Sequence, residues 1–303
     1  MTNMIQVDHH SGTIRSIPFG QHQIDTLLFH IEGDEVHRAN KPVIVRLHGI
    51  LGNLLDETEH FLPVELALRG YSSVNMNTLL ANLGLFYGFG LVERVIPQID
   101  SVCEFLRGLG FKKIVVAGHG LGGCMAILYA AARSDSDKWP DLCGVIAIAT
   151  PYSLPDTIRL RWQRFGSEPS YDEVCRIATE RFATSDDGPD QTILIRRAHG
   201  PSRQPRHTEV YTLKTWWHLA GPEAQGAKPY LHIGKVKVPI LLVDGLHDDV
   251  LVQQSDEDLL AVARTAGHDT VTRVELDANH AFDGKHPELG QTIVEWLERL
   301  AGS

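Results

Sequence analysis

The chain has 303 residues, of which 43% are hydrophobic, enough to bury the core of one large domain or two small ones. Its formal net charge of −10 is spread along the chain without a long charged block, so we expect no nucleic-acid surface. No apolar stretch approaches the roughly 20 residues of a membrane-spanning helix, so no membrane contact is expected. The N-terminal residues also lack the basic and apolar segments of a secretory signal.

Cysteine and histidine usage excludes the common metal patterns. The four cysteines show no CxxC spacing and mostly lie in apolar stretches, which is typical of small buried residues in a reducing cytoplasm. The chain has 16 histidines, but neither an HExxH nor an HxH pattern. We therefore expect a cytoplasmic protein with no metal and no other cofactor.

Apolar runs alternate with amphipathic stretches along most of the chain. Residues 13–32 predict two strands joined by a turn at Gly20. Further strands are predicted at 42–47, 71–76, 112–118, 143–149, 239–244 and 271–276, and helices at 58–69, 90–109, 121–133, 254–266 and 287–301. This alternation predicts an α/β fold with a doubly wound, mostly parallel sheet.

One segment interrupts the alternation. Residues 152–237 contain helical patches around 156–165, 171–184 and 209–220, but no clear buried strand. We predict that they form a helical cap, and that 1–151 and 238–303 form the core. Aromatic and basic side chains are frequent in this cap: Trp162, Tyr211, Trp216, Trp217, Arg159, Arg161, Arg164, Arg196 and Arg197. We expect at least half of the aromatic residues to pack inside the cap, and most of the arginines to form a solvated face.

The motif GHGLGG at 118–123 lies between a buried strand and a helix rich in small residues. This is the setting of a G-x-S-x-G nucleophile elbow, in which small residues let strand and helix approach closely. The N–H groups at the start of the helix then point toward the site. Every position of the pattern fits except one, because Gly120 stands where the nucleophilic serine is expected.

The same letters also satisfy GxGxxG, the dinucleotide-binding pattern. That pattern belongs after the first strand of its domain, with an acidic residue at the end of the next strand. Here the motif comes late in the chain, and Asp135 and Asp137 precede the next strand instead of following it. A phosphate-binding P-loop is excluded because no lysine follows at the required spacing.

Three further motifs follow other predicted strands. His48-Gly49 follows the strand at 42–47, and Asp248, with Asp249 as its rival, follows the strand at 239–244. His280 follows the strand at 271–276 in the motif Asn-His-Ala-Phe. Together with the elbow, these motifs resemble the α/β-hydrolase superfamily in identity and in order, nucleophile before acid before base. The resemblance covers essentially the whole chain.

The resemblance implies a role for each residue. Asp248 would orient the general base His280, and the backbone N–H groups of Ile50 and Leu121 would form the oxyanion hole. Substrate contacts are expected from His48, Gly49, His119, Trp216 and Trp217. The partner would be a small molecule, namely an ester, a thioester, an amide or a lactone. A homodimer is compatible with the sequence.

Glycine at the nucleophile position leaves three interpretations. The chain is a serine hydrolase silenced by substitution, or an enzyme whose His280–Asp248 pair acts as a base without a nucleophile, as in some lyases and cofactor-free oxygenases. The third is a non-catalytic protein that binds a ligand or partner. Cys124 lies one helical turn beyond Gly120 and is expected to pack in the core instead of replacing the serine. Loss of a triad nucleophile typically costs about 10⁶-fold in rate.

Overall fold

The computed structural model describes residues 3–7, 10–29, 38, 40–56, 58–83, 86–87, 90–135, 141–182, 191–197, 207–251 and 255–302. Parts of three predicted segments (30–32, 183–184 and 254) lie outside this set. Within the described residues, nine strands form the main sheet, in the order β1-β2-β3-β5-β4-β8-β9-β13-β14. They are β1 (Asn3–Val7), β2 (His10–Phe19), β3 (His22–Phe29), β4 (Val43–Leu47), β5 (Ser73–Met76), β8 (Ile114–His119), β9 (Leu142–Ile148), β13 (Ile240–Gly245) and β14 (Val271–Leu276).

The strand pairing changes from antiparallel to parallel across the sheet. β1, β2, β3 and β5 pair antiparallel, whereas β5, β4, β8, β9, β13 and β14 pair parallel. The side chains of β4 and β8 are buried throughout, as expected for central strands covered on both faces. The carboxyl ends of the parallel strands meet at one edge of the sheet, so the loops that follow them come together there.

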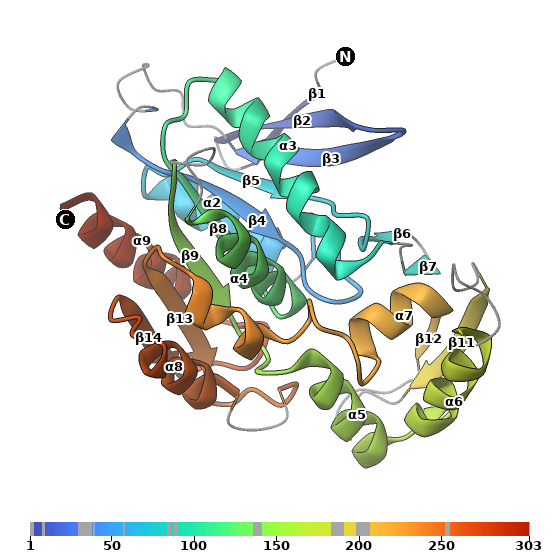
Figure 1. The fold of residues 1–303 in the computed structure, drawn as a ribbon. Coiled ribbons are helices and arrows are strands. Elements are labelled where there is room, and N and C mark those ends of the chain that lie inside the picture. The colour runs from blue at the N-terminus through green and yellow to red at the C-terminus, as the bar shows by residue number, and fades with distance from the viewer. Residues whose placement is uncertain are drawn as a thin grey trace.

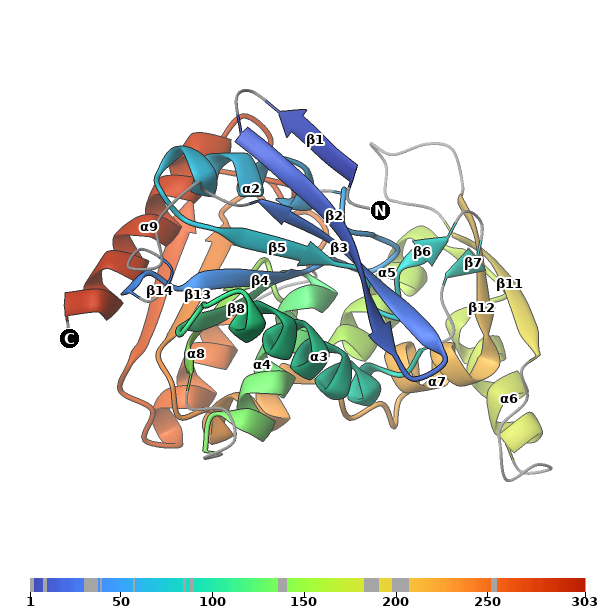
Figure 2. The same cartoon turned by 90° about the horizontal axis from the view of Figure 1, so that it is seen from above.

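Helices cover both faces of the sheet. They are α2 (Thr58–Leu68), α3 (Val95–Gly108), α4 (Leu121–Arg133), α8 (Ser255–Thr265) and α9 (His286–Gly302). α3, α4 and α8 pack on one face, and α2 and α9 pack together on the other (Figures 1 and 2). Both predicted helix layers and all the predicted core strands are therefore present. Within the described residues, no helix has the length and apolar character needed to cross a membrane.

The insertion after β9 mixes helices with strands. It contains α5 (Leu154–Phe165), α6 (Tyr171–Phe182) and α7 (Leu213–Ala220), together with β10 (Ser167–Glu168), β11 (Thr192–Arg197) and β12 (His207–Thr212). The last three strands join β6 (Asn82–Leu83) and β7 (Phe86–Tyr87) in a small second sheet. The insertion lies beside one end of the main sheet (Figures 1 and 2).

The helical prediction for 209–220 is therefore wrong before Leu213. The strand β12 is rich in β-branched and aromatic residues, which favours extended backbone. Its partner β11 alternates buried Ile193 and Ile195 with exposed neighbours, a period of two that terminal arginines obscure.

Candidate active site

The elbow lies where β8 passes into α4. Gly120 has φ 54° and ψ −115°, a conformation that side chains other than hydrogen adopt only under strain. Its carbonyl accepts the N–H of Gly123 at 3.1 Å, and its own N–H donates to the carbonyl of Ile148 at 2.9 Å. The backbone thus makes the sharp strand-to-helix turn that the sequence motif predicts, with no side chain at its centre.

The glycines of the motif serve two different purposes. A Cβ on Gly118 would overlap the backbone of Gly122, and one on Gly122 would overlap the carbonyl of Leu47. A Cβ on Gly123 would overlap the side chain of Thr150. At Gly120, in contrast, the nearest atom of another element would be Nε2 of His280, 3.9 Å away. Close packing therefore demands the other three glycines, while the missing side chain at Gly120 would have room and would face the histidine.

Asp248 and His280, which the sequence predicts as acid and base, are brought together by the loops after β13 and β14. Oδ2 of Asp248 lies 2.7 Å from Nδ1 of His280, and both side chains are 9% exposed. Oδ1 of Asp248 accepts the backbone N–H groups of Val250 at 2.8 Å and Leu251 at 2.9 Å. Asp249 is exposed, so of the two candidates Asp248 is the one placed to orient the base.

The surroundings of Asp248 favour its charged form. Burial by itself raises the pKa of this carboxyl, but the hydrogen bond and charge of His280 and the two backbone donors lower it by more. The net result is a pKa below the ordinary value of an aspartate. A carboxylate at this position fixes the proton of His280 on Nδ1, which leaves the lone pair on Nε2 facing Gly120.

His119 supports the base from behind. Its side chain is fully buried, and its Nε2 donates to the carbonyl of His280 at 2.9 Å. The two rings are 4.5 Å apart between centroids. These contacts connect the elbow directly to the loop after β14. The side chain of His119 is therefore placed to position His280. The sequence had suggested a substrate contact for His119.

The loop after β4 lies next to the elbow because Leu47 pairs with Gly118 across β4 and β8. His48 is buried in this loop, with Nδ1 2.9 Å from the carbonyl of Gly49 and Nε2 3.0 Å from Oγ1 of Thr78. His48 therefore holds the loop in place instead of reaching outward. Leu121 is the first residue of α4, where a backbone N–H has no acceptor within the helix.

A buried polar network lies under the same loop. Nη2 of Arg46 donates to Oε1 of Glu59 at 2.9 Å, and both side chains are almost completely buried. Burial lowers the pKa of Arg46 to about 10, although the charge of Glu59 acts in the opposite direction. Nδ2 of Asn75 donates to the carbonyls of Leu54 and Glu59, each at 2.9 Å. These bonds attach the loop after His48 to β5 and α2.

Backbone strain gathers around the same site. Leu51 has φ 58°, Ala149 φ 42° and Phe282 φ 58°, all in the left-handed region that residues other than glycine rarely adopt. They follow β4, β9 and β14, respectively. Such strained positions cluster at functional sites, where the surrounding structure holds them.

Comparisons with known proteins agree with this geometry at the level of fold. No protein-family model and no curated protein sequence matches the chain. Among solved structures, Est1E from Butyrivibrio proteoclasticus has 16% identity and a TM-score of 0.61, over 96% of this chain and 99% of that one. An esterase from Pyrococcus furiosus has 13% identity and a TM-score of 0.64, over 95% and 91%. A thioesterase domain from the curacin biosynthetic pathway has 16% identity and a TM-score of 0.54, over 94% and 99%.

The chain has the α/β-hydrolase fold. Gly120, Asp248 and His280, the three residues that the sequence motifs predicted for the site, lie together in this structure. The parallel part of the sheet explains their convergence, because β8, β13 and β14 all deliver their carboxyl ends to one edge.

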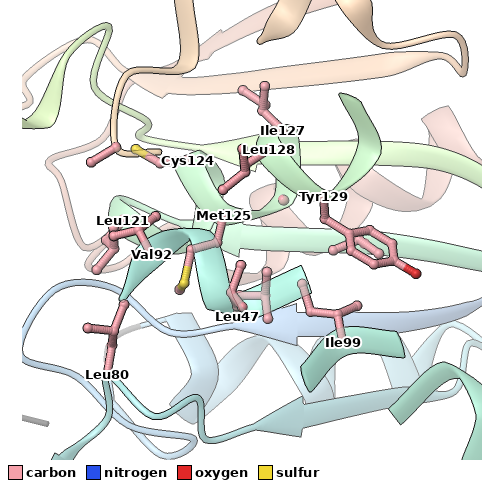
Figure 3. Packing of buried hydrophobic residues seen from close by; sticks show 14 of the residues in the cluster. Leu47, Leu80, Val92, Ile99, Leu121, Cys124, Met125, Ile127, Leu128 and Tyr129 are labelled. Carbon is pink, nitrogen blue, oxygen red and sulfur yellow. The ribbon is translucent and has the colours of Figure 1, made fainter. Parts of the chain in front are cut away.

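Cys124 does not replace the missing nucleophile. It is fully buried on α4, among the apolar side chains that include Leu121 and Met125 (Figure 3). Its Sγ lies 3.7 Å from the carbonyl of Gly120, and burial raises the pKa of the thiol. A neutral buried thiol is a poor nucleophile, so the prediction of a core cysteine is confirmed.

The two neighbouring tryptophans of the cap, Trp216 and Trp217, differ in burial. Trp216 is fully buried, with its ring 6.1 Å from that of Trp162 and 5.6 Å from that of Tyr171. It lies on the apolar face of α7 with Leu213 and the last residues of the helix, so it belongs to the core of the cap. Trp217, by contrast, is only partly buried.

Arg161 has a role that the sequence did not suggest. Its buried side chain donates from Nη1 to the carbonyl of Val250 at 2.7 Å and lies 3.5 Å from that of Asp249. The cap helix α5 is thus attached to the loop that carries Asp248. The sequence contains a signal for this contact. Ile158, Arg161 and Trp162 share one face of a helix, and a charged residue on a buried face needs partners. In the described part of the chain, no group of three or more metal-binding side chains is assembled.

Proposed function

We propose that this site cleaves acyl compounds, meaning small carboxylic esters, thioesters, amides or lactones, and that glycine at position 120 removes its covalent route. The observation that carries the proposal is that Nε2 of His280 faces the side-chain position of residue 120, while Nδ1 contacts Asp248. Asp248 holds His280 at 2.7 Å, and Nε2 of His280 would lie 3.9 Å from a Cβ on Gly120. A hydroxyl on that Cβ would come within hydrogen-bond distance of the base.

The supporting chemistry is that of acyl transfer. Tetrahedral intermediates need donors for an oxyanion, and we assign this role to the backbone N–H groups of Ile50, in the loop after β4, and of Leu121, at the start of α4. The fold agrees with this class of reaction, since the solved structures that resemble the chain include one named as an esterase and one named as a thioesterase domain.

The test is to restore the nucleophile. Gly120→Ser should give turnover of a short aryl ester and covalent labelling by a fluorophosphonate, detected by intact-protein mass spectrometry. Labelling should disappear in the double variant Gly120→Ser/His280→Gln, because the serine then has no base. A folded Gly120→Ser protein with neither labelling nor turnover would falsify the proposal.

A second candidate is base catalysis by the dyad without a nucleophile. The intact Asp248–His280 pair favours it, because a decayed site would have no reason to keep a 2.7 Å contact and a pKa of Asp248 below the ordinary value. The unaltered protein would then convert a substrate, and His280→Gln would abolish that activity. Substrate conversion that is indifferent to His280 would exclude this candidate.

A further inference from the structure

The space beside Gly120 is the starting observation. We call it the Gly120 notch: the volume next to Cα of Gly120 on the side of His280. A Cβ placed there would have only Nε2 of His280 within 4 Å, counting atoms outside the immediate chain neighbours, at 3.9 Å. At the neighbouring motif glycines, the same construction overlaps other residues. The notch is thus the one position of the motif where the elbow has room for an atom that the chain does not supply.

The notch faces a group ready to accept a proton. Nδ1 of His280 is engaged by Asp248 at 2.7 Å, so Nε2 is the ring nitrogen that accepts. The orientation of His280 is held from two sides, by Asp248 and by the bond from Nε2 of His119 to its carbonyl at 2.9 Å. An imidazole held in this way, with its accepting nitrogen toward the missing side chain of residue 120, is the arrangement that activates a hydroxyl.

We propose that the Gly120 notch binds a small alcohol, and that the protein transfers an acyl group from a bound ester directly to this acceptor without an acyl-enzyme. The inference rests on the proposed acyl-cleaving function. Methanol has the composition of a serine side chain with one added hydrogen, so it restores the hydroxyl that Gly120 lacks. Its oxygen would then meet Nε2 of His280, the atom that a Cβ on Gly120 would contact at 3.9 Å.

The step balances without any further reactant. The acceptor oxygen forms a new bond to the acyl carbon, and its proton passes to Nε2 of His280. The bond between the acyl carbon and the leaving oxygen then breaks, and the same proton passes to that oxygen. The products are the new ester and the released alcohol or phenol. Water in the notch would follow the same course and give the acid.

The rate should lie well below that of a serine enzyme. Tethering a nucleophile provides effective concentrations of up to about 10⁵–10⁸ M in favourable cases, and a free acceptor lacks this advantage. General base catalysis contributes about 10²–10⁴-fold, which His280 retains. An activated substrate, such as an aryl acetate, compensates for part of the loss.

The experiment uses p-nitrophenyl acetate with methanol as the acceptor, and gas chromatography to separate methyl acetate from acetate. The unaltered protein should form methyl acetate at a rate that saturates with methanol concentration. His280→Gln should lower this rate by about 10²–10⁴-fold. Gly120→Ala is the matched variant, because its methyl group fills the notch and leaves the dyad in place. It should lose methyl acetate formation while its circular dichroism spectrum stays native.

Two results would overturn the inference. One is methyl acetate formation by a folded Gly120→Ala protein at the rate of the unaltered one. The other is formation of acetate alone at every methanol concentration. Fluorophosphonate labelling of Gly120→Ser separates the two proposals. Labelling without methyl acetate formation by the unaltered protein rejects only the notch. Absence of labelling and of aryl-ester turnover rejects the acyl-cleaving function itself.

Discussion

Gly120 combines a strained backbone with an open side-chain position, and this combination distinguishes it from the other glycines of its motif. Where close packing requires glycine, a methyl group forces neighbouring backbone apart. Where only the φ and ψ angles favour glycine, a methyl group costs conformational strain of about 1–3 kcal/mol and nothing more. The two situations occur two residues apart in this chain, so they can be compared in one experiment.

We expect Gly122→Ala to destabilise the protein more than Gly120→Ala does. The added methyl group at Gly122 meets the carbonyl of Leu47 on the neighbouring strand, and neither backbone can yield without disturbing the sheet. Overpacking of this kind typically costs about 1–3 kcal/mol, in addition to the lost fit of strand and helix. Urea unfolding of both variants measures the difference. Equal stabilities would show that the close approach of β4 and α4 is less rigid than the structure indicates.

The acid–base pair leads to a prediction on pH. The pKa of Asp248 is lower in the folded protein than the ordinary value of about 3.9, so the unfolded chain binds the proton more readily. The stabilisation is present above that ordinary value and is lost as the pH falls through the folded pKa. The free energy of unfolding should therefore fall more steeply below about pH 4 in the unaltered protein than in Asp248→Asn.

The matched control for this pH measurement is Asp249→Asn. Asp249 is the exposed neighbour, and its replacement should leave the acid limb of the stability curve almost unchanged. Identical acid limbs for the unaltered protein and Asp248→Asn would mean that the contact with His280 does not stabilise the carboxylate.

Sequence patterns could predict the residues of the site but not all of their roles. Gly120, Asp248 and His280 were predictable because each follows a recognisable buried strand in a known order. The choice between Asp248 and Asp249 depends on one residue of loop geometry, which no spacing rule fixes. The roles of His48 and His119 depend on partners distant in sequence, such as Thr78 and the carbonyl of His280. The motifs suggested that these two residues contact the substrate. In the structure their side chains form hydrogen bonds that hold the loops in place.

At the scale of elements, the order of strands and helices in the core follows from the sequence. Buried strands and amphipathic helices have distinct periods, and the predicted bounds agree with the structure within a few residues. The small second sheet does not follow from the sequence, because β6, β7 and β10 have two residues each, too few to show a period. It becomes a sheet only through pairing between segments distant in the chain, such as Val210 with Phe86.

The contact between α5 and the loop that carries Asp248 predicts that the cap affects the rate of ester cleavage. In the Gly120→Ser protein, Arg161→Met should lower kcat by about 10- to 100-fold, because it releases the Val250–Leu251 peptide, whose N–H donates to Asp248. The pH profile of kcat/KM should also change, because a displaced Asp248 no longer holds His280 in its orientation. A purely structural role would leave that profile unchanged.

Two further variants complete this measurement. Arg161→Lys keeps a positive donor and should recover part of the rate. Arg159→Met removes a guanidinium from the same helix, where Arg159 is paired with Asp156 at 3.0 Å on the exposed side, and should leave the profile unaltered. If Arg161→Met and Arg159→Met behave alike, Arg161 does not position the acid.

For the molecule as a whole, the division into a core (1–151 and 238–303) and a cap (152–237) describes chain order better than it describes packing. The buried residues of the cap, among them Trp162 and Trp216, belong to the same hydrophobic cluster as the side chains of α3 and α4. Hydrogen bonds also cross between the two parts. Oγ1 of Thr215 donates to the carbonyl of Gly90 at 3.1 Å, and the N–H of Gly226 donates to Glu93 at 3.0 Å.

This continuity predicts that the cap unfolds together with the core. Chains of this length often unfold in steps, so coincidence of independent probes is a meaningful test. Tryptophan fluorescence, with three reporters in the cap at Trp162, Trp216 and Trp217, should change at the same urea concentration as far-ultraviolet circular dichroism. Trp216→Ala should shift both midpoints together, by about 3–5 kcal/mol of stability, because it removes a fully buried ring. A cap that moved as a separate lid would give an earlier fluorescence transition, and Trp216→Ala would then shift that transition alone.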